Sequence, residues 1–223
     1  MTGRIEEICA ALKPCRVFAD VGCDHGYMSE YMLKNDLCER AYISDISAGS
    51  LKKAERLLHK YVLSGRCIAV VANGLEGIQE ACDEVLIAGM GGMEIVEILQ
   101  KYPLPERFVL QPMKNSKRVR AFLAERGAGI ERDYTFGEGK FYDLITGTAA
   151  GGSKYSGREL LYGRDNLKRP TPAFLGLLKH DANNLIAALS VPGFSGERRE
   201  AVREKLSELE ELIHETERRL QDS

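Results

Sequence analysis

Several features that would indicate other classes of protein are missing from this sequence. No apolar run approaches the roughly 20 residues that a membrane-spanning helix needs. The N-terminal stretch 1–14 contains acidic residues and has no cleavage-like ending, so we expect neither a membrane span nor a signal peptide. None of the six cysteines forms a C-x-x-C pair, and no histidine stands at metal-finger spacing. We therefore expect reduced thiols in a cytoplasmic protein, and no metal site.

A strong charge of either sign is also absent. The net charge of -2 neither requires nor forbids a nucleic-acid partner, because local patches decide that question. Hydrophobic residues make up 44% and charged residues 29%, which allows a packed core and argues against disorder. The 223 residues suffice for one ordinary domain with an appendage, or for one large domain.

Up to about residue 150 the sequence alternates short β-rich runs with helical patterns, which is typical of a parallel α/β sheet. Ser47 and Ser50 are candidate caps for a helix over residues 47–64, and Gly127 is expected to end the helix after the fifth strand. The expected strands are Arg16–Gly22, Arg40–Ile46, Arg66–Ala72, Asp83–Gly89 and Arg107–Pro112.

Residues 129–149 contain two further β-rich runs joined by "GEGK", a pattern that predicts a hairpin. The sheet of a dinucleotide-binding domain is parallel throughout. A parallel sheet that ends in an antiparallel hairpin strand therefore indicates another fold. It is typical of the Rossmann-like sheet of class I S-adenosylmethionine (SAM) methyltransferases, and this is the fold class that we expect.

The C-terminal part has another pattern. Residues 149–172 are rich in Gly, Ser and Pro and are expected to form a linker. Two heptad seams follow, and the segment 190–196 between them suits an antiparallel pair that resembles a coiled coil. The seams are Leu175, Leu178, Ala182, Leu185 and Leu189, then Val202, Leu206, Leu209, Ile213, Thr216 and Leu220. We predict two domains, 1–153 and 154–223.

The stretch "DVGCDHGY", Asp20–Tyr27, resembles a nucleotide-binding glycine loop that lacks one glycine. Asp24 stands where a glycine would approach a pyrophosphate, and a carboxylate would repel that group. Asp45 ends the second expected strand, and its two oxygens match a ribose diol. SAM carries a ribose and positive charge but no phosphate, so these acids favour it over NAD. The alternative is that Asp20 and Asp24 only cap the turn and the next helix.

Two later strand ends could complete such a pocket. Asn73 could accept a hydrogen bond from the adenine amino group; the alternative is an Asn-Gly turn, which alone is the more common explanation of this dipeptide. The three glycines in "AGMGGMEI", Ala88–Ile95, would let the backbone pass close to a ligand; a tight turn is the alternative. Tyr27 could stack on a base and His25 could bond its edge, or both could be packing residues.

Basic residues gather in two places. One group follows the fifth strand and another lies in the linker, where phosphate contacts would be expected. A solvated helix surface is the alternative for each residue taken singly. The residues are Lys114, Lys117, Arg118 and Arg120, then Lys154, Arg158, Arg164, Lys168 and Arg169.

Taken together, the motifs resemble one family over nearly the whole chain. In order they are "ADVGCDHGY", "SDISAGSLKKA", "NGL", "LIAGMGGMEIVEIL", "LQPMKNSKRVRAFL" and "GKFYDLITG", followed by "YSGRELLYGRDNL" and the helical hairpin. They resemble the bacterial tRNA adenine N1-methyltransferase family that modifies position 22. The resemblance implies SAM as methyl donor, and adenine N1 in the D-arm region of tRNA as acceptor.

The resemblance, together with the strand-end motifs and the basic clusters described above, gives three sets of candidate residues. The cofactor set is Arg4, Asp20, Gly22, Asp24, His25, Asp45, Ile46, Asn73, Gly74, Ala88, Gly89 and Met90. Tyr27, Met90 and Gly91 are expected to position the acceptor. The RNA set is Gln111, Lys114, Lys117, Arg118, Arg120, Arg164, Lys168 and Arg169. Asn73 departs from the family, which usually has Asp there, but Asn retains an acceptor oxygen. The family often has small residues at the position of Gly26 and a proline near Ser29, and we expect these differences to be tolerated.

Other functions remain open at this point. One is a non-catalytic RNA-binding protein on a methyltransferase scaffold, against which the intact Asp20 and Asp45 argue. Another is a methyltransferase with a non-RNA substrate, against which the basic clusters argue. The helical hairpin is expected to contact tRNA, with self-association as its alternative use; a monomer is favoured.

Overall fold

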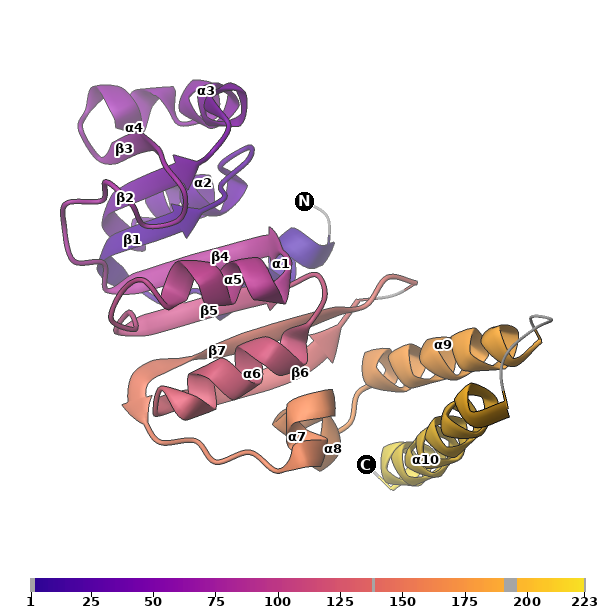
Figure 1. The fold of residues 1–223 in the computed structure, drawn as a ribbon. Helices are drawn as coiled ribbons and strands as arrows, with labels where there is room; N and C mark the ends of the chain where they lie inside the picture. Colours follow the sequence, from indigo (N-terminus) through magenta and orange to yellow (C-terminus); the bar gives the residue numbers. More distant parts are fainter. Residues whose placement is uncertain (1–2, 138, 191–195, 223) are drawn as a thin grey trace.

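The computed structural model describes residues 3–137, 139–190 and 196–222. Within them one seven-stranded sheet has the order β3-β2-β1-β4-β5-β7-β6 (Figure 1). The first five strands pair in parallel and β7 pairs antiparallel with both β5 and β6. The strands are β1 Cys15–Val21, β2 Cys38–Asp45, β3 Cys67–Val71, β4 Glu84–Met90, β5 Arg107–Pro112, β6 Ala128–Phe136 and β7 Tyr142–Gly151. The predicted fold class is confirmed.

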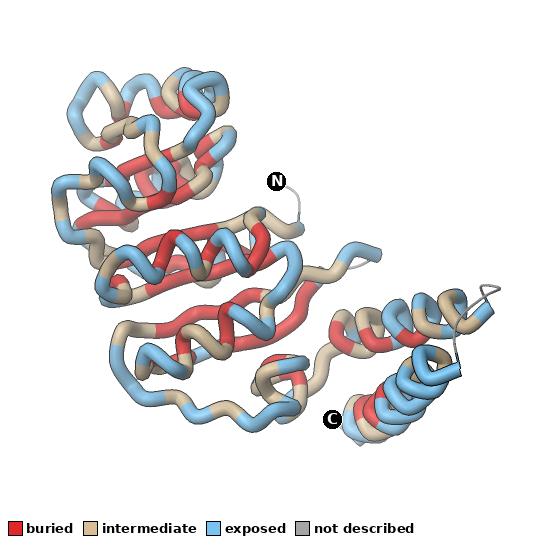
Figure 2. The backbone as a smooth tube through the Cα atoms, in the orientation of Figure 1, coloured by how far each residue is buried: buried red, intermediate tan, exposed pale blue. Residues whose placement is uncertain are grey.

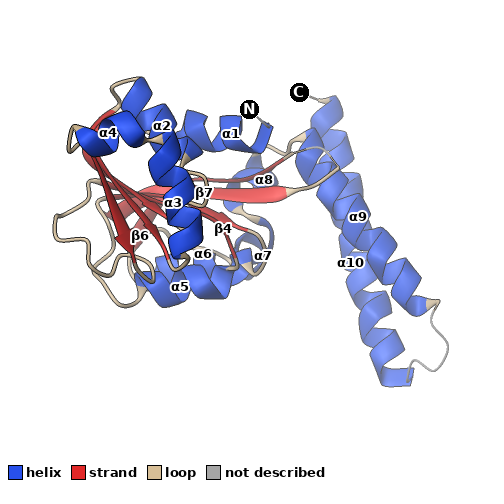
Figure 3. Cartoon of the chain, turned by 90° about the horizontal axis from the view of Figure 1, so that it is seen from above, coloured by secondary structure: helices blue, strands red, loops and turns tan. Residues whose placement is uncertain are grey.

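Helices cover both faces of the sheet, and a helical pair lies beyond its β6–β7 side (Figures 1 and 3). The helices are α1 Gly3–Ala11, α2 Tyr27–Lys34, α3 Ala48–Leu57, α4 His59–Leu63, α5 Gly92–Leu99, α6 Ser116–Glu125, α7 Gly157–Tyr162, α8 Arg164–Lys168, α9 Pro172–Leu189 and α10 Gly196–Gln221. None of the described helices is long and apolar enough to cross a bilayer.

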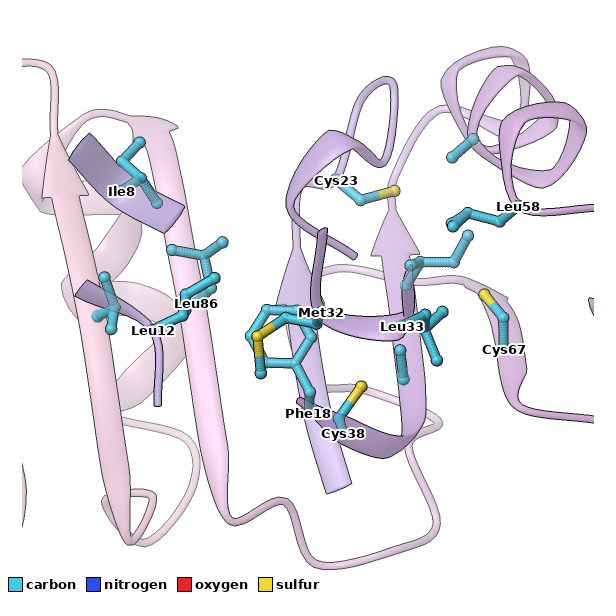
Figure 4. Packing of buried hydrophobic residues seen from close by; sticks show 14 of the residues in the cluster. Ile8, Leu12, Phe18, Cys23, Met32, Leu33, Cys38, Leu58, Cys67 and Leu86 are labelled. Carbon is cyan, nitrogen blue, oxygen red and sulfur yellow. The ribbon is translucent and has the colours of Figure 1, made fainter. Parts of the chain in front are cut away.

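Two apolar layers hold the helices to the sheet, and Figure 2 shows the buried residues concentrated on its central strands. On one face α1 to α4 contribute to a cluster in which Ile8 and Leu12 lie on the β4–β5 side and Met32 packs beside Phe18 (Figure 4). On the other face α5 and α6 bury residues such as Ile95 against the strands. Because both faces are covered, central strands such as β1 are almost continuously buried, as expected for parallel sheets.

The predicted helix 47–64 begins as expected but is divided. Ser47 caps α3, its hydroxyl oxygen accepting the Ser50 backbone N–H at 3.2 Å. Leu58 then leaves helical backbone angles, separating α3 from α4, while its side chain is fully buried. The helical periodicity continues across this break because α4 still has to bury Tyr61 on the same side. The pattern therefore predicted the buried face but not the break.

The predicted linker is wrong as a description of residues 157–168, which form α7 and α8. Side chains of α8 cap the edge strand β6. Asp165 Oδ2 accepts the Asp133 backbone N–H, and Asn166 Oδ1 accepts that of Thr135, each at 2.9 Å. Without them these N–H groups would be left on an open sheet edge. The domain boundary at 153/154 stays a prediction, because this segment contacts both β6 and the helical pair.

The helical pair α9–α10 packs close to the predicted seams, but Phe174 and Leu212, which were not predicted, are buried while their predicted neighbours Leu175 and Ile213 are only partly buried. Its buried centre consists of Phe174, Leu178, Ala182, Leu209 and Leu212. Pro172 opens α9 behind a Thr171 cap that accepts the Phe174 N–H at 3.1 Å. Most of the turn predicted at 190–196 lies outside the described residues. Seen from above, the pair projects away from the sheet (Figure 3).

Candidate functional site

A cavity of about 490 Å³ lies at the carboxyl ends of the central strands, where the strand order reverses between β1 and β4. Ligands of open α/β sheets bind in this position. The cavity is lined by Gly22, Asp45, Ile46, Ala72, Asn73, Gly74, Gly89, Met90, Gly91, Glu94, Glu97, Ile98 and Lys114. Of the predicted cofactor set, Arg4, Asp20, Asp24, His25 and Ala88 do not line it.

Asp45 is held in a fixed orientation at the end of β2. Its Oδ1 accepts the Ser47 backbone N–H at 2.8 Å, and its Oδ2 accepts the Asp24 N–H at 3.3 Å. Each carboxylate oxygen has a second lone pair, so the group can still accept hydrogen bonds from a ligand. Asp24 itself has φ 45 and an exposed side chain. In this structure Asp24 therefore orients Asp45 through its backbone.

Asp20 lies beneath the cavity instead of in its wall. It is 2% exposed, and Ser29 of α2 donates its hydroxyl hydrogen to Asp20 Oδ2 at 2.8 Å. Burial raises the pKa of Asp20 from its ordinary 3.8 to about 6. Asp20 thus ties the start of α2 to the end of β1. Sequence reasoning did not assign a role to Ser29; its position one turn into the helix after the loop was the available signal.

Glycines allow the strand ends to approach each other closely. At Gly22, with φ 71, a Cβ would lie 2.2 Å from Met90 Cε; at Gly74, with φ 78, it would lie 2.6 Å from Ile98 Cγ2. Larger residues would be strained there by both conformation and contact. Because Gly22 and Gly74 have no side chains, Met90 and Ile98 can pack against the strand ends and line the cavity.

The segments that follow β4 and β5 bring a carboxylate, Glu94, and an ammonium group, Lys114, to the cavity. The Gly91 N–H donates to Glu94 Oε2 at 2.5 Å, and the Gly92 N–H donates to the Lys114 carbonyl at 2.8 Å. Glu94 and Glu97 line the cavity although the sequence analysis did not select them. They stand on the same face of α5, three residues apart, a spacing that the helical pattern made visible.

Arg4 and Gln111 meet at the far side of the β4 turn. Arg4 Nε donates to Gln111 Oε1 at 2.8 Å, and the guanidinium lies over the Tyr142 ring. A Cβ on Gly89 would lie 2.8 Å from an Arg4 terminal nitrogen, so Arg4 reaches the rim of the cavity. Gln111 is fully buried and uses its amide within the protein. The prediction that Gln111 contacts RNA is wrong, because no surface of it is accessible.

His25 and Tyr27 form an exposed aromatic pair beside the cavity. Their rings stack at 5.5 Å between centroids with an interplanar angle of 16°, and Tyr27 is 41% exposed. Tyr27 begins α2, directly after the Asp20–Gly26 turn. The geometry leaves one face available for a further ring, but the stacking role stays a prediction.

The predicted RNA set divides by exposure. Lys114, Lys117, Arg118, Lys168 and Arg169 are exposed. Arg164 is half-buried, lies over the Tyr155 ring and pairs with Glu159 at 3.2 Å. Contact of the exposed residues with RNA stays a prediction.

The prediction for Arg120 is wrong. Arg120 is 1% exposed; its Nε donates to both Asp133 oxygens at 2.9 Å, and a terminal nitrogen pairs with Asp143 at 3.1 Å. The acids on β6 and β7 hold this side chain inside the protein, where RNA cannot reach it.

The chemistry of the cavity suits a nucleoside that carries positive charge. Asp45 offers acceptors for a diol, Glu94 and Glu97 add negative charge, and Ile46, 76% exposed, offers apolar surface. A volume of about 490 Å³ is in the range of small-molecule sites. Asn73 lines the cavity and can present either its carbonyl or its amide group. No group of three potential metal ligands occurs among the described residues.

The strand order, the antiparallel terminal hairpin and the cavity at the strand ends define a Rossmann-like methyltransferase fold. The chain belongs to the methyltransferase-domain family, which matches residues 1–145.

Known relatives are consistent with that class. A Bacillus subtilis protein named tRNA (adenine(22)-N(1))-methyltransferase is 30% identical over 155 residues, which cover 67% of this chain and 65% of that protein. The chain thus spans slightly less than two thirds of that relative. A Streptococcus pneumoniae structure, described as a candidate tRNA (m1A22) methyltransferase, is 26% identical with a TM-score of 0.87, covering 96% of this chain and all of that one. A second structure of the Streptococcus protein, in complex with S-adenosyl-L-methionine, is 25% identical with a TM-score of 0.85, at the same coverage.

Proposed function

We propose that the protein transfers the methyl group of SAM to N1 of adenine 22 in tRNA. The observation that carries the proposal is the cavity at the strand-order reversal, in which Asp45 and two further carboxylates face glycine-rich turns. The named Bacillus subtilis relative supports tRNA as substrate, and the Streptococcus pneumoniae complex supports SAM as donor. A tRNA substrate would place the reaction in the cytoplasm.

Different residues of the cavity would bind different parts of SAM. Asp45 would accept hydrogen bonds from the ribose hydroxyls, and Asn73 would accept one from the adenine amino group. Glu94 and Glu97 would favour the positively charged end. When bound, SAM would supply an activated methyl group, and the Gly89–Gly91 backbone would help to hold it in the cavity.

The N1 atom of adenine can attack without losing a proton. Its lone pair is free in the neutral base, so the N1–carbon bond forms as the carbon–sulfur bond breaks and the base becomes a cation. No general base is required. Catalysis then depends on positioning, which can lower a barrier by about 7–11 kcal/mol in well-oriented systems. The backbone at Gly91 and Gly92 packs closely against Glu94, Lys114 and Asn115, which would hold this turn in place during the reaction.

The N1 edge of a paired adenine is covered by its partner, so the target must be unpaired or extruded. Tyr27 offers an exposed ring at the cavity and is our candidate surface for stacking the extruded base. Exposed lysines at the start of α6 would attract the surrounding phosphates.

Radiolabelled methyl transfer from SAM to unmodified tRNA, followed by nucleoside digestion, tests the proposal. We expect the label in 1-methyladenosine, and its loss when adenine 22 of the tRNA is replaced by guanine. A label in another nucleoside, or no transfer by protein that binds SAM, would refute the proposed function.

A further inference from the structure

A second cavity, of about 450 Å³, lies between the methyltransferase sheet and helix α9. We call it the junction cleft and define it by Met113, Lys114, Lys117, Phe141, Leu161 and Leu177. Lys114 also lines the cavity at the strand ends. The two cavities therefore meet at Lys114 and are neighbours on the surface.

The floor of the junction cleft is apolar and accessible. Met113 and Leu161 are each 50% exposed, an unusual state for large hydrophobic side chains that stand together. Phe141 rests on α9, since a Cβ on Gly176 would lie 2.7 Å from its ring. Contacts of Phe141 with α9 keep the cleft walls in place, while Met113 and Leu161 offer surface to a ligand.

The cleft is lined by charges of both signs. Lys114 and Lys117 make no ion pair or hydrogen bond through their side chains within the part of the chain that the structure describes, and both are exposed. Asp181 of α9 and Asp143 of β7 also line the cleft, and Asp143 is already paired with the buried Arg120 at 3.1 Å. A ligand with an anionic end and an apolar ring with amino groups matches this arrangement, because carboxylates accept N–H groups and lysines attract phosphate.

We propose that the junction cleft binds a nucleotide next to the target adenine, with its phosphate at Lys114 and Lys117 and its base against Met113 and Leu161. This rests on the proposed function, in which RNA is the substrate. Extruding adenine deprives a neighbouring base of its stacking partner, and the cleft supplies a replacement surface beside the reaction site. The occupied cleft would thus favour the extruded state.

Three variants test the apolar surface and the positive charge of the cleft. Met113→Ser and Leu161→Ser remove apolar surface from different elements, and Lys117→Ala removes one charge. Leu63→Ser and Lys34→Ala are matched controls, because both residues are exposed and lie outside the cleft. Binding of unmodified tRNA is measured by fluorescence anisotropy at 50 and 200 mM salt, with S-adenosylhomocysteine binding by calorimetry as a check on the first cavity.

We expect each serine variant to weaken tRNA binding about tenfold at both salt concentrations, as loss of a stacking surface does. Lys117→Ala should reduce the slope of log affinity against log salt by about one. The controls and S-adenosylhomocysteine binding should stay within about twofold of the parent. Parental tRNA binding by both serine variants would overturn the proposal.

The binding measurement separates this proposal from the proposed function. The serine variants could lose tRNA binding while the parent transfers no methyl group to adenine. The proposed function would then be wrong, and the cleft would remain an RNA-binding site. If the parent methylates adenine 22 and the serine variants bind and react as the parent does, only the proposed role of the cleft is wrong. A parent that binds no RNA would refute both.

Discussion

The Ser29 hydroxyl donates to Asp20 Oδ2 at 2.8 Å in the buried space below the cavity, which joins helix α2 to the end of strand β1. This bond fixes the loop that carries Gly22 and orients Asp45 through the Asp24 backbone. Because burial raises the pKa of Asp20 to about 6, the bond connects the geometry of the site to pH.

Asp20 should make the protein less stable as pH rises from about 4 to 7. A raised pKa means that the folded state binds more protons than the unfolded state between the two values, so the free energy of unfolding falls across that window. For a shift from 3.8 to about 6 the fall is about 3 kcal/mol. Urea unfolding at several pH values should show a smaller fall in Asp20→Asn. An identical pH profile in the variant would contradict the assignment.

Gly22→Ala should weaken S-adenosylhomocysteine binding about tenfold, or about 1.4 kcal/mol. The new Cβ would lie 2.2 Å from Met90 Cε, so the Met90 side chain, which lines the cavity, has to move. Gly65→Ala is the control, because Gly65 has φ 73 but no atom within 4 Å of such a Cβ. Calorimetry compares the two variants. Equal losses would mean that backbone strain, and not the Met90 contact, is responsible.

Asp45 should recognise the ribose diol. Asp45→Ala is expected to reduce S-adenosylhomocysteine affinity about 10-fold or more, the effect of losing hydrogen bonds to a charged group. Removing the ligand's 2′-hydroxyl should weaken binding to the parent but should add little in the variant. Affinities of both proteins for both ligands form a cycle that isolates the contact. Additive losses would show that Asp45 acts elsewhere.

Arg120→Ala should destabilise the fold by about 3–5 kcal/mol, because Asp133 would keep a buried charge without its partner. Arg118→Ala is a close control on the same helix; Arg118 is exposed, and its loss should change stability by less than about 0.5 kcal/mol. Urea unfolding measures both. Equal, small effects would indicate that Arg120 is accessible to solvent after all.

The sequence predicted features that depend on local patterns. Apolar runs located the strands to within about two residues, and the carboxyl-end rule brought Asp45, Asn73 and Gly89 to one cavity. Prediction from the sequence failed where contacts with residues distant in the chain determine the structure. Arg120 is buried because acids on β6 and β7 reach it, and no pattern within α6 shows that. Helix α8 is held in place because Asp165 and Asn166 cap a free strand edge, which is a property of the sheet. Helix α7 has a local start signal, the Ser156–Glu159 capping box, which the Gly- and Ser-rich composition of the segment masked.

Tyr27 should affect methyl transfer without affecting cofactor binding. Its ring is exposed at the cavity and is not among the lining residues, so Tyr27→Ala should leave S-adenosylhomocysteine affinity within about twofold of the parent. If the ring stacks on the extruded adenine, kcat/KM for tRNA should fall roughly 5- to 150-fold, the range that base stacking on an aromatic side chain covers. Tyr27→Phe keeps the ring and should retain most of the activity. A low rate in both variants would assign the role to the hydroxyl group, and a parental rate in Tyr27→Ala would remove Tyr27 from the reaction.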